Sequence, residues 1–488
     1  VGSTDGNLTP KTPMITIAET GVAGSEKYYY TLNNCYNAIA GNDSEYTGKN
    51  IDIVLYNGAS SEKSENAMKN SSTSNTIPNA IRNTSSNSVR LMVASGNEIE
   101  IPSNTLEFAN CTKLVYADLK GFKTDSVTTM GYWFNQCTNL TYLNLKNFNT
   151  SNVINMECMF QNCNKLKVLD LTSFNTTNVK NMKSTFSSCS KLETIYVSEN
   201  FKTDSVTDST MMFQACNSLV GGKGTTLSNV THTYARIDGG TSNPGYFTAG
   251  PPIGPKLRPD AVGDIVFKDG SAMASSDIAS ITDAQKEAAI AVIFYKGTRL
   301  NNGDDSTTER LLGVGLCQGT KSWCIGGANA YSVRIETILC ENEPGNYGVW
   351  PNPAVRDGRE NFEKIGQYLE SNDDTGTPGK YPAFEFARNY KEQENSRVEE
   401  TPYEKDWYLP TFAELYYVRG RKGDLNSVFN SLGVSELNVG NNIFYWSSSQ
   451  SHATGTDYDG KAICLNMVNG ISDGSKSMEN SVLVIRQF

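Results

Sequence analysis

Five cysteines recur at a nearly constant spacing near the middle of the chain. Cys111, Cys137, Cys163, Cys189 and Cys216 are 26, 26, 26 and 27 residues apart. After each of the first four come a Leu three residues on, an aliphatic residue eight on, and then a Phe, a Thr, a Val and a second Phe at matching intervals. A fixed period of this length predicts a solenoid, in which each unit buries its apolar side only against its neighbours.

Within one repeat, alternation predicts a short strand. Leu140, Leu143 and Leu145 fall on the inward side of this strand, and the residues between them fall on the outward side. Outward positions in several repeats carry an aromatic or a short polar side chain: Tyr116, Tyr142 and Tyr196, with Asp118, Asn144 and Asp170. We predict that the tyrosines form an exposed binding strip for protein or glycan. The alternative is an ordinary solvated sheet surface.

Composition excludes several classes of function. The 488 residues carry a net charge of −10 and no Lys/Arg cluster of more than two or three residues, so we expect no nucleic-acid partner. No apolar run approaches the ~20 residues of a membrane-spanning helix. Residues 1–24 lack a charged start and an apolar core, so no signal peptide is predicted. Only 19% of the residues are charged while Asn, Ser, Thr and Gly abound, which favours an exported, extracellular protein over a cytosolic one.

Sequence patterns divide the chain into five parts. We predict a flexible arm over 1–25, an α/β cap over 26–110, repeats with a closing cap over 111–250, a proline-rich linker over 251–260 and a second domain over 261–488. Capping boxes at Thr282 and Thr411 predict two helix starts in that domain. The other elements expected there are strands at 263–267, 291–295, 444–448, 462–467 and 482–488, and helices at 361–370 and 381–390.

The eleven cysteines leave at least one unpaired within the chain. We expect the five repeat cysteines to be buried, reduced thiols, with a disulfide within the ladder as the alternative. Cys317 and Cys324 are close enough in sequence for a local disulfide, and Cys340 is the other cysteine near them. With only two histidines in the chain, neither at ligand spacing from the thiols, no zinc site and no cofactor are predicted.

The repeat resembles a known family. Its pattern C-x2-L-x4-L-x2-F-x-T-x2-V-x2-M-x3-F is similar to the BspA-type leucine-rich repeats of bacterial surface proteins, and the segment 235–247 resembles their usual ending. In the fourth repeat an extra residue precedes Phe201, and Ser209 replaces the Met of the pattern. The resemblance implies a leucine-rich-repeat solenoid over about 100–250.

The second domain resembles the C-type-lectin-like domains that end a group of exported bacterial proteins. The resemblance lies in Trp407–Leu415 (WYLPTFAEL), Tyr445–Ser449 (YWSSS) and Val482–Phe488 (VLVIRQF). The expected fold class is therefore α+β, a capped leucine-rich-repeat solenoid followed by a C-type-lectin-like domain. The combination resembles surface proteins of host-associated spirochaetes such as treponemes, which implies export and display.

In relatives of the lectin-like fold, including those diversified by retroelements, ligands bind to the loops near the C-terminus. That resemblance implies ligand-binding residues at Ser451, His452, Asp457, Tyr458, Asn469, Ser472 and Asp473. The alternative is solvated loops without a partner. Trp407 and Trp446 could stack on sugars, but their positions in the pattern favour a core role. The acidic clusters 301–305 and 372–374 lack the alternating spacing of a calcium loop and favour solvated turns.

Catalysis is not expected. Formylglycine-generating enzymes share the lectin-like fold, but Cys464 is the one cysteine after Cys340 and its strand position favours packing. No phosphate-binding loop, G-x-S-x-G or HExxH motif occurs. We therefore predict a cell-surface adhesin that binds a protein or glycan of its host or environment. The alternative is a self-associating subunit of a surface layer, sheath or filament.

Overall fold

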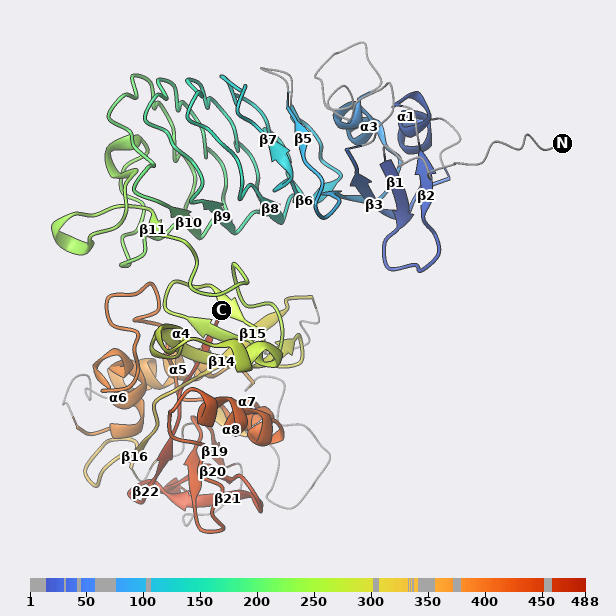
Figure 1. The fold of residues 1–488 in the computed structure, drawn as a ribbon. Coiled ribbons are helices and arrows are strands. Elements are labelled where there is room, and N and C mark those ends of the chain that lie inside the picture. The colour runs from blue at the N-terminus through green and yellow to red at the C-terminus, as the bar shows by residue number, and fades with distance from the viewer. Residues whose placement is uncertain are drawn as a thin grey trace. The chain divides into compact units, whose positions relative to one another are not determined.

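The computed structural model describes residues 15–29, 32–41, 45–57, 76–101, 107–301, 307–331, 333, 335, 338–340, 356–371, 379–451 and 459–488. The chain divides into two compact units, Val1–Pro252 and Ile253–Phe488, each with mixed helices and strands (Figure 1). The division falls inside the range predicted as a linker. Residues at the start of the second unit hydrogen-bond within that unit, since Gly254 N donates to Ser271 Oγ at 2.7 Å and Lys256 pairs with Ala272.

The first unit opens with a six-stranded sheet in the order β2-β1-β3-β4-β6-β8. Strands β3, β4, β6 and β8 are parallel, so the predicted cap and the first repeats share one sheet. The elements of this region are β1 (Ile15–Glu19), β2 (Lys27–Tyr29), α1 (Leu32–Ala40), β3 (Asn50–Leu55), α3 (Ile77–Asn83), β4 (Ser88–Val93), β5 (Ile99–Glu100), β6 (Leu114–Asp118), β7 (Phe122–Lys123) and β8 (Tyr142–Asn144).

One sequence prediction is wrong in this sheet. The flexible arm was predicted to include residues 15–19, but these residues form β1 between β2 and β3, with Ile15 and Ile17 fully buried. The alternation of Ile15, Thr16 and Ile17 is a strand signal only a few residues long, and the surrounding Gly, Thr and Ser obscure it. Burial of two isoleucines against the sheet contributes about 3–5 kcal/mol, which outweighs the weak local preference.

Beyond β6 the repeats stack with a register of one repeat. Tyr116 lies opposite Tyr142 in β6 and β8, and Val168 lies opposite Thr194 in β9 (Val168–Leu171) and β10 (Thr194–Val197). Equivalent phenylalanines stack with centroids 5.4–5.9 Å apart, in the order Phe108, Phe134, Phe160, Phe186 and Phe213. Each turn therefore buries its apolar side chains against the same side chains of the turns before and after it.

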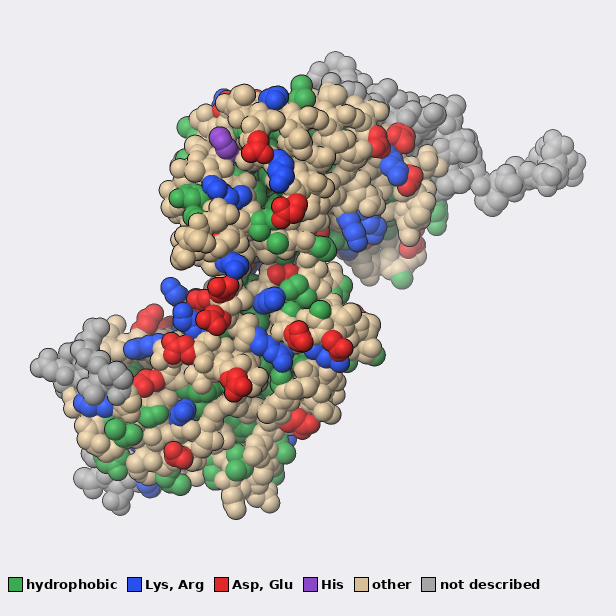
Figure 2. Space-filling view, turned by 60° about the vertical axis from the view of Figure 1, so that its left-hand side comes forward, with side chains coloured by type: hydrophobic (Ala, Val, Ile, Leu, Met, Phe, Trp, Pro, Cys, Tyr) green, Lys and Arg blue, Asp and Glu red, His purple; other side chains and the backbone are tan. Residues whose placement is uncertain are grey.

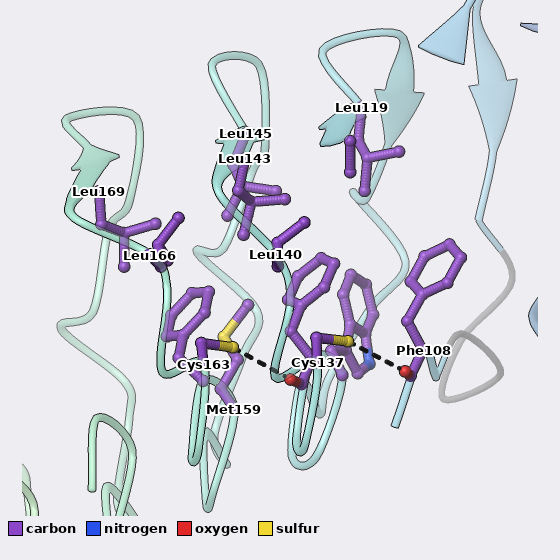
Figure 3. Packing of buried hydrophobic residues seen from close by; sticks show 14 of the residues in the cluster. Phe108, Leu119, Cys137, Leu140, Leu143, Leu145, Met159, Cys163, Leu166 and Leu169 are labelled. Atoms are coloured by element: carbon purple, nitrogen blue, oxygen red, sulfur yellow. Dashed lines mark hydrogen bonds between the residues drawn. The ribbon is translucent and has the colours of Figure 1, made fainter. Parts of the chain in front are cut away.

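The repeat cysteines lie inside this stack as buried thiols (Figure 3). From the second repeat on, each donates to the carbonyl of a phenylalanine one repeat earlier: Cys137 Sγ to Phe108 O at 3.2 Å, and Cys163 Sγ to Phe134 O at 3.2 Å. Cys111 Sγ, at the start of the stack, donates to Pro78 O at 3.5 Å. The same carbonyl of Phe134 also accepts from Cys137 N at 3.1 Å. The position requires a small side chain that can donate into the interior, which explains why cysteine recurs there.

Threonine and asparagine side chains also join the repeats. The buried Thr150 Oγ1 donates to Asn175 O at 2.9 Å and accepts from Asn175 N at 2.8 Å, one repeat onward. Thr124 and Thr176 make the same double hydrogen bond. Exposed asparagines donate to carbonyls 27 residues earlier at 2.8–2.9 Å: Asn139, Asn147, Asn152 and Asn178. The richness in Thr and Asn is thus partly structural.

The end of the stack is closed by a segment that returns to β10. Strand β11 (Thr248–Ala249) pairs in parallel with β10, after two short 3-10 helices, η1 (His232–Tyr234) and η2 (Gly240–Ser242). Asp238 is the centre of this cap. Its carboxylate accepts from the backbone N–H groups of Lys223, Thr225, Gly240 and Gly245 at 2.9–3.3 Å, and from Thr225 Oγ1 at 2.8 Å.

The second unit has two five-stranded sheets, ordered β13-β12-β14-β15-β23 and β16-β22-β18-β20-β21, and a small pair, β17-β19. The C-terminal β23 pairs with β15, near the start of the unit. Its strands are β12 (Ile265–Phe267), β13 (Ala272–Met273), β14 (Ala289–Gly297), β15 (Arg310–Gly315), β16 (Gly319–Ser322), β17 (Leu339–Cys340), β18 (Phe444–Trp446), β19 (Gln450–Ser451), β20 (Lys461–Asn466), β21 (Gly470–Ser475), β22 (Glu479–Val482) and β23 (Ile485–Gln487).

Helices cover these sheets. They are η3 (Ser275–Ser280), α4 (Asp283–Ala288), α5 (Gly358–Ser371), α6 (Pro382–Arg388), η6 (Tyr390–Glu392), α7 (Phe412–Gly420) and α8 (Lys422–Ser431). Both predicted capping boxes are present, at Thr282 for α4 and at Thr411 for α7. Trp407 and Trp446 are buried, which confirms their core role. Cys317 and Cys324 carry thiols and form no disulfide.

A buried ionic cluster fixes α7 in the second unit. Arg310 Nη2 donates to Glu414 Oε1 at 3.1 Å, to Asp357 Oδ1 at 3.2 Å and to Tyr408 Oη at 2.9 Å. The other oxygen of Glu414 accepts from Thr411 N, at the start of α7, and from Gly358 N, at the start of α5. Because each charge is paired and hydrogen-bonded, the cluster is tolerated in the interior and ties two helix starts to β15.

Candidate functional site

The outer face of the first sheet carries one row of large polar side chains in register. Asp52 in β3 lies opposite Arg90 in β4, Arg90 opposite Tyr116 in β6, and Tyr116 opposite Tyr142 in β8. We call these four residues the sheet-face row. Parallel neighbouring strands lie about 4.8 Å apart, which places like-facing side chains of one row in direct contact.

Tyr116 is enclosed within this row. Its ring stacks on Tyr142 with centroids 4.4 Å apart and an interplanar angle of 8°, while the Arg90 guanidinium lies 4.8 Å from its centroid. Arg90 is in turn held by Asp52, at 3.7 Å. Since neighbours occupy both faces of Tyr116, the row offers solvent the edges and hydroxyls of the rings. The row is a preformed surface of aromatic and cationic groups, because each side chain is held by its neighbours in the row.

A second row runs beside the first, two residues further along each strand. It contains Asp118, Asn144 and Asp170, and Asn144 Nδ2 donates to Asp118 Oδ1 at 2.9 Å. Asp170 Oδ1 accepts from Thr172 N at 3.0 Å, in a local turn after β9. The half-buried tyrosines are therefore bordered by fixed carboxylate and amide groups, which can accept or donate hydrogen bonds to a ligand.

Tyr196 does not belong to the exposed strip, so this part of the sequence prediction is wrong. It has no exposed surface. Strand β11 pairs with β10 at this point, opposite Thr248, and the following Gly250 approaches the Tyr196 side chain so closely that a Cβ there would lie 3.5 Å from Tyr196 Cβ. The returning chain covers an outward position that repeat periodicity alone leaves open.

The hydroxyl of Tyr142 acts as a neutral hydrogen-bonding group. Burial raises the pKa of Tyr142 to about 12, and the neighbouring Tyr116 and Asp118 act in the same direction. Within the described residues, no group of three or more His, Cys, Asp or Glu side chains is placed to hold a metal ion. The arrangement is suited to non-covalent recognition through aromatic edges, hydroxyls and one guanidinium.

The predicted binding residues of the second unit are only partly within the described structure. His452, Asp457 and Tyr458 lie outside the described residues, and of Ser451 only its backbone place in β19 is described. Ser472 and Asp473 lie on β21, opposite Cys464 and Ile463, and not in a loop. Asn469 is exposed in the turn between β20 and β21.

Among the described residues, Asn469 and residue 459 lie at opposite ends of β20. Asn469 is at one end of the β20–β21 hairpin, whereas residue 459, where the chain from Ser451 is described again, precedes the opposite end of β20. A strand of six residues spans about 20 Å, which separates the two. At the far end, Lys476 Nζ donates to Asp459 O at 2.8 Å and to Ala330 O at 2.7 Å, so a buried ammonium fixes that end.

Sequence reasoning missed Asp52 and Arg90. They lie on β3 and β4 in the predicted cap, which the sequence pattern alone treats as a separate closing element. The alternation Val89-Arg90-Leu91-Met92-Val93 already places Arg90 outward. What the sequence does not reveal is that these cap strands continue the sheet of the repeats in register with Tyr116.

Comparisons with known proteins describe the repeats. Residues 104–222 match a family described as "Mycoplasma protein of unknown function, DUF285", which is less than half of the chain. No curated protein matches the sequence. A solved fimbrial protein from Bacteroides ovatus ATCC 8483 is similar at 14% identity and a TM-score of 0.33, over 47% of this chain and 49% of that one. The chain thus spans about half of that protein (49%), and a likeness this weak carries no argument about function.

A helix that spans a membrane must be both long and apolar. None of the described helices combines the length and the apolar character that crossing a bilayer requires. On the face drawn in Figure 2, backbone and uncharged polar side chains cover most of the first unit.

Proposed function

We propose that this chain is a bacterial cell-surface protein that binds a protein or glycan of its host or environment without catalysis. The observation that carries the proposal is the sheet-face row, in which Arg90, Tyr116 and Tyr142 stack in register across three strands. Aromatic and arginine side chains supply much of the binding energy at recognition surfaces. Here they are held before a ligand arrives, which lowers the entropic cost of binding.

The proposal includes the architecture expected from the sequence. We propose that the stacked repeats are a leucine-rich-repeat solenoid closed by the Asp238 cap, and that the second unit is a C-type-lectin-like domain. The one-repeat register of β6 with β8 and of β9 with β10 supports the first part. The pairing of the C-terminal β23 with β15 supports the second, because it joins the ends of the domain in one sheet. The segment 451–458 of that domain, which the sequence predicts to bind ligand, is proposed as part of a further ligand surface.

A paired binding assay tests the sheet-face row. The wild-type chain is applied to an array of neutral oligosaccharides and to a panel of purified extracellular-matrix proteins. The Tyr142→Ala variant is then measured against every probe that binds. We expect at least a tenfold loss of affinity, because the substitution removes one aromatic ring of the row and releases Tyr116 from its stack.

Tyr132→Ala provides the matched control. Tyr132 belongs to the same repeat region and is 43% exposed, but it lies in a turn away from the strands. Equal losses in both variants, or no loss in Tyr142→Ala, would refute the role of the row. Size-exclusion chromatography and electron microscopy of the same preparations address self-association. Ordered polymers that persist in Tyr142→Ala, with no probe bound by the wild type, would favour the structural-subunit alternative.

A further inference from the structure

A second exposed surface lies where α7 and α8 meet the β20–β21 turn. Arg419, near the end of α7, donates from Nη2 to Val468 O at 2.8 Å and from Nε to Met467 O at 3.4 Å. Lys422, at the start of α8, donates from Nζ to Met467 O at 2.5 Å. Two cations from the helices are therefore anchored on the backbone of one tight turn.

These two cations have no acidic partner in the part of the chain that the structure describes. The neighbouring Arg421 differs, since its Nη1 lies 3.6 Å from Asp424 Oδ2. The backbone carbonyls that hold Arg419 and Lys422 orient them but do not neutralise their charge. Two uncompensated positive charges side by side are notable in a chain of net charge −10. They create a local positive potential that favours an anionic ligand.

Exposed apolar and amide groups border the same two cations. Tyr416 is 44% exposed and Val468 is 43% exposed. The Arg419 guanidinium lies 5.8 Å from the Tyr416 ring centroid and also donates a hydrogen bond to Val468 O. It therefore lies between the Tyr416 ring and Val468. The exposed Asn469 follows directly, with its backbone N–H bound to Asn466 Oδ1 at 2.7 Å. Cation, aromatic ring and amide thus lie within one small area.

We infer that Tyr416, Arg419, Lys422 and Asn469 form a binding site for an acidic sugar residue. A uronic-acid type of sugar combines a carboxylate, an apolar ring face and hydroxyl groups on a ring of this size. The two cations match the carboxylate, Tyr416 and Val468 match the apolar face, and the Asn469 amide matches a hydroxyl. An acidic peptide would match the charges but would leave the exposed aromatic ring unexplained.

The site goes beyond the proposed sheet-face row, because it lies in the other unit and uses different residues. The test uses the full chain and immobilised uronic-acid oligosaccharides, with the same oligosaccharides after reduction of their carboxyl groups as the neutral probe. Wild type should bind the acidic probe at least tenfold more tightly than the reduced one. Arg419→Gln should lose at least tenfold in affinity for the acidic probe.

Arg421→Gln is the matched control, since it removes the same charge two residues away, from an arginine that already has an acidic partner. It should lose at most about twofold. Tyr416→Ala, which removes a ring that is 44% exposed, should also weaken binding. Calorimetric unfolding checks that each variant remains folded.

Several results would overturn the inference. These are equal binding of the acidic and reduced probes, equal losses in Arg419→Gln and Arg421→Gln, full binding by Tyr416→Ala, or equally tight binding of poly-glutamate, which would indicate an acidic polypeptide as the partner. Tyr142→Ala should bind the uronic-acid probe as tightly as the wild type does. The proposal for this site and the proposal for the sheet-face row can therefore be refuted independently of each other.

Discussion

At the scale of single residues, Asp238 shows how one carboxylate holds the end of the repeat stack. Burial alone would raise its pKa, but the hydrogen bonds from Thr225, Gly240 and Lys223 outweigh burial and lower it. Asp238→Asn keeps the shape but turns one acceptor into a donor that faces N–H groups. We expect a loss of about 3 kcal/mol in the free energy of unfolding at neutral pH, measured by urea denaturation.

The pH dependence of this loss follows from the sign of the shift. The folded pKa of Asp238 is below its unfolded value, so the ionised carboxylate stabilises the fold above the unfolded pKa, and this contribution disappears as pH falls through the folded one. The difference between wild type and Asp238→Asn should therefore shrink in acid. A difference that stays constant from neutral pH to about pH 3 would contradict this account.

At the scale of structural elements, the repeat is held by hydrogen bonds that its threonines exchange with the next turn. Thr150→Val preserves the side-chain volume but leaves Asn175 N and O without their partner. We expect a destabilisation of about 2–3 kcal/mol in denaturant unfolding. Thr177→Val is the control, because Thr177 is exposed, and it should change stability by less than about 0.5 kcal/mol. Equal effects of the two substitutions would mean that the hydrogen bonds of Thr150 with Asn175 do not contribute to the free energy of unfolding.

The thiol ladder is a second feature of the repeat elements. Burial raises the pKa of Cys111 and Cys216 to about 12, and that of Cys137, Cys163 and Cys189 well above the usual value. The thiolate is the reactive form, so these thiols should stay unreactive in the folded protein and react only as the first unit unfolds.

Timed labelling with a thiol-reactive dye checks this expectation in a Cys317→Ser background, which removes the half-buried thiol of the second unit. The labelling rate of the ladder should rise with denaturant in parallel with the unfolding transition. Fast labelling of the ladder in native buffer would show that the repeats open locally.

At the scale of the whole molecule, the two units have separate hydrophobic cores. The core of the first runs from Ile15 to Phe247, and the two core clusters of the second share no residue with it. We therefore expect two independent unfolding transitions in calorimetry. Thr150→Val should lower the midpoint temperature of only one transition, that of the first unit. Lys476→Met should lower only the other, because it leaves the carbonyls of Ala330, Val333 and Asp459 without the buried ammonium. A single transition shifted by both variants would refute the independence.

The repeat and its buried side chains could be predicted from the sequence alone. The period of Cys, Leu and Phe determines which residues point inward, because each turn can bury them only against identical turns. The two capping boxes could also be predicted from the sequence, because Thr282 with Gln285 and Thr411 with Glu414 form them within one helical turn. Such features depend on short-range chemistry or strict repetition.

Only the tertiary structure decided which outward residues meet. Arg90 reaches Tyr116 because β4 pairs with β6, and Tyr196 is buried because β11 returns to β10. Arg419 reaches Val468 because α7 packs near the β20–β21 turn. Each contact joins segments separated by long stretches of chain. Their local sequences do not encode the pairing, because strand register and helix packing are set by burial over the whole unit.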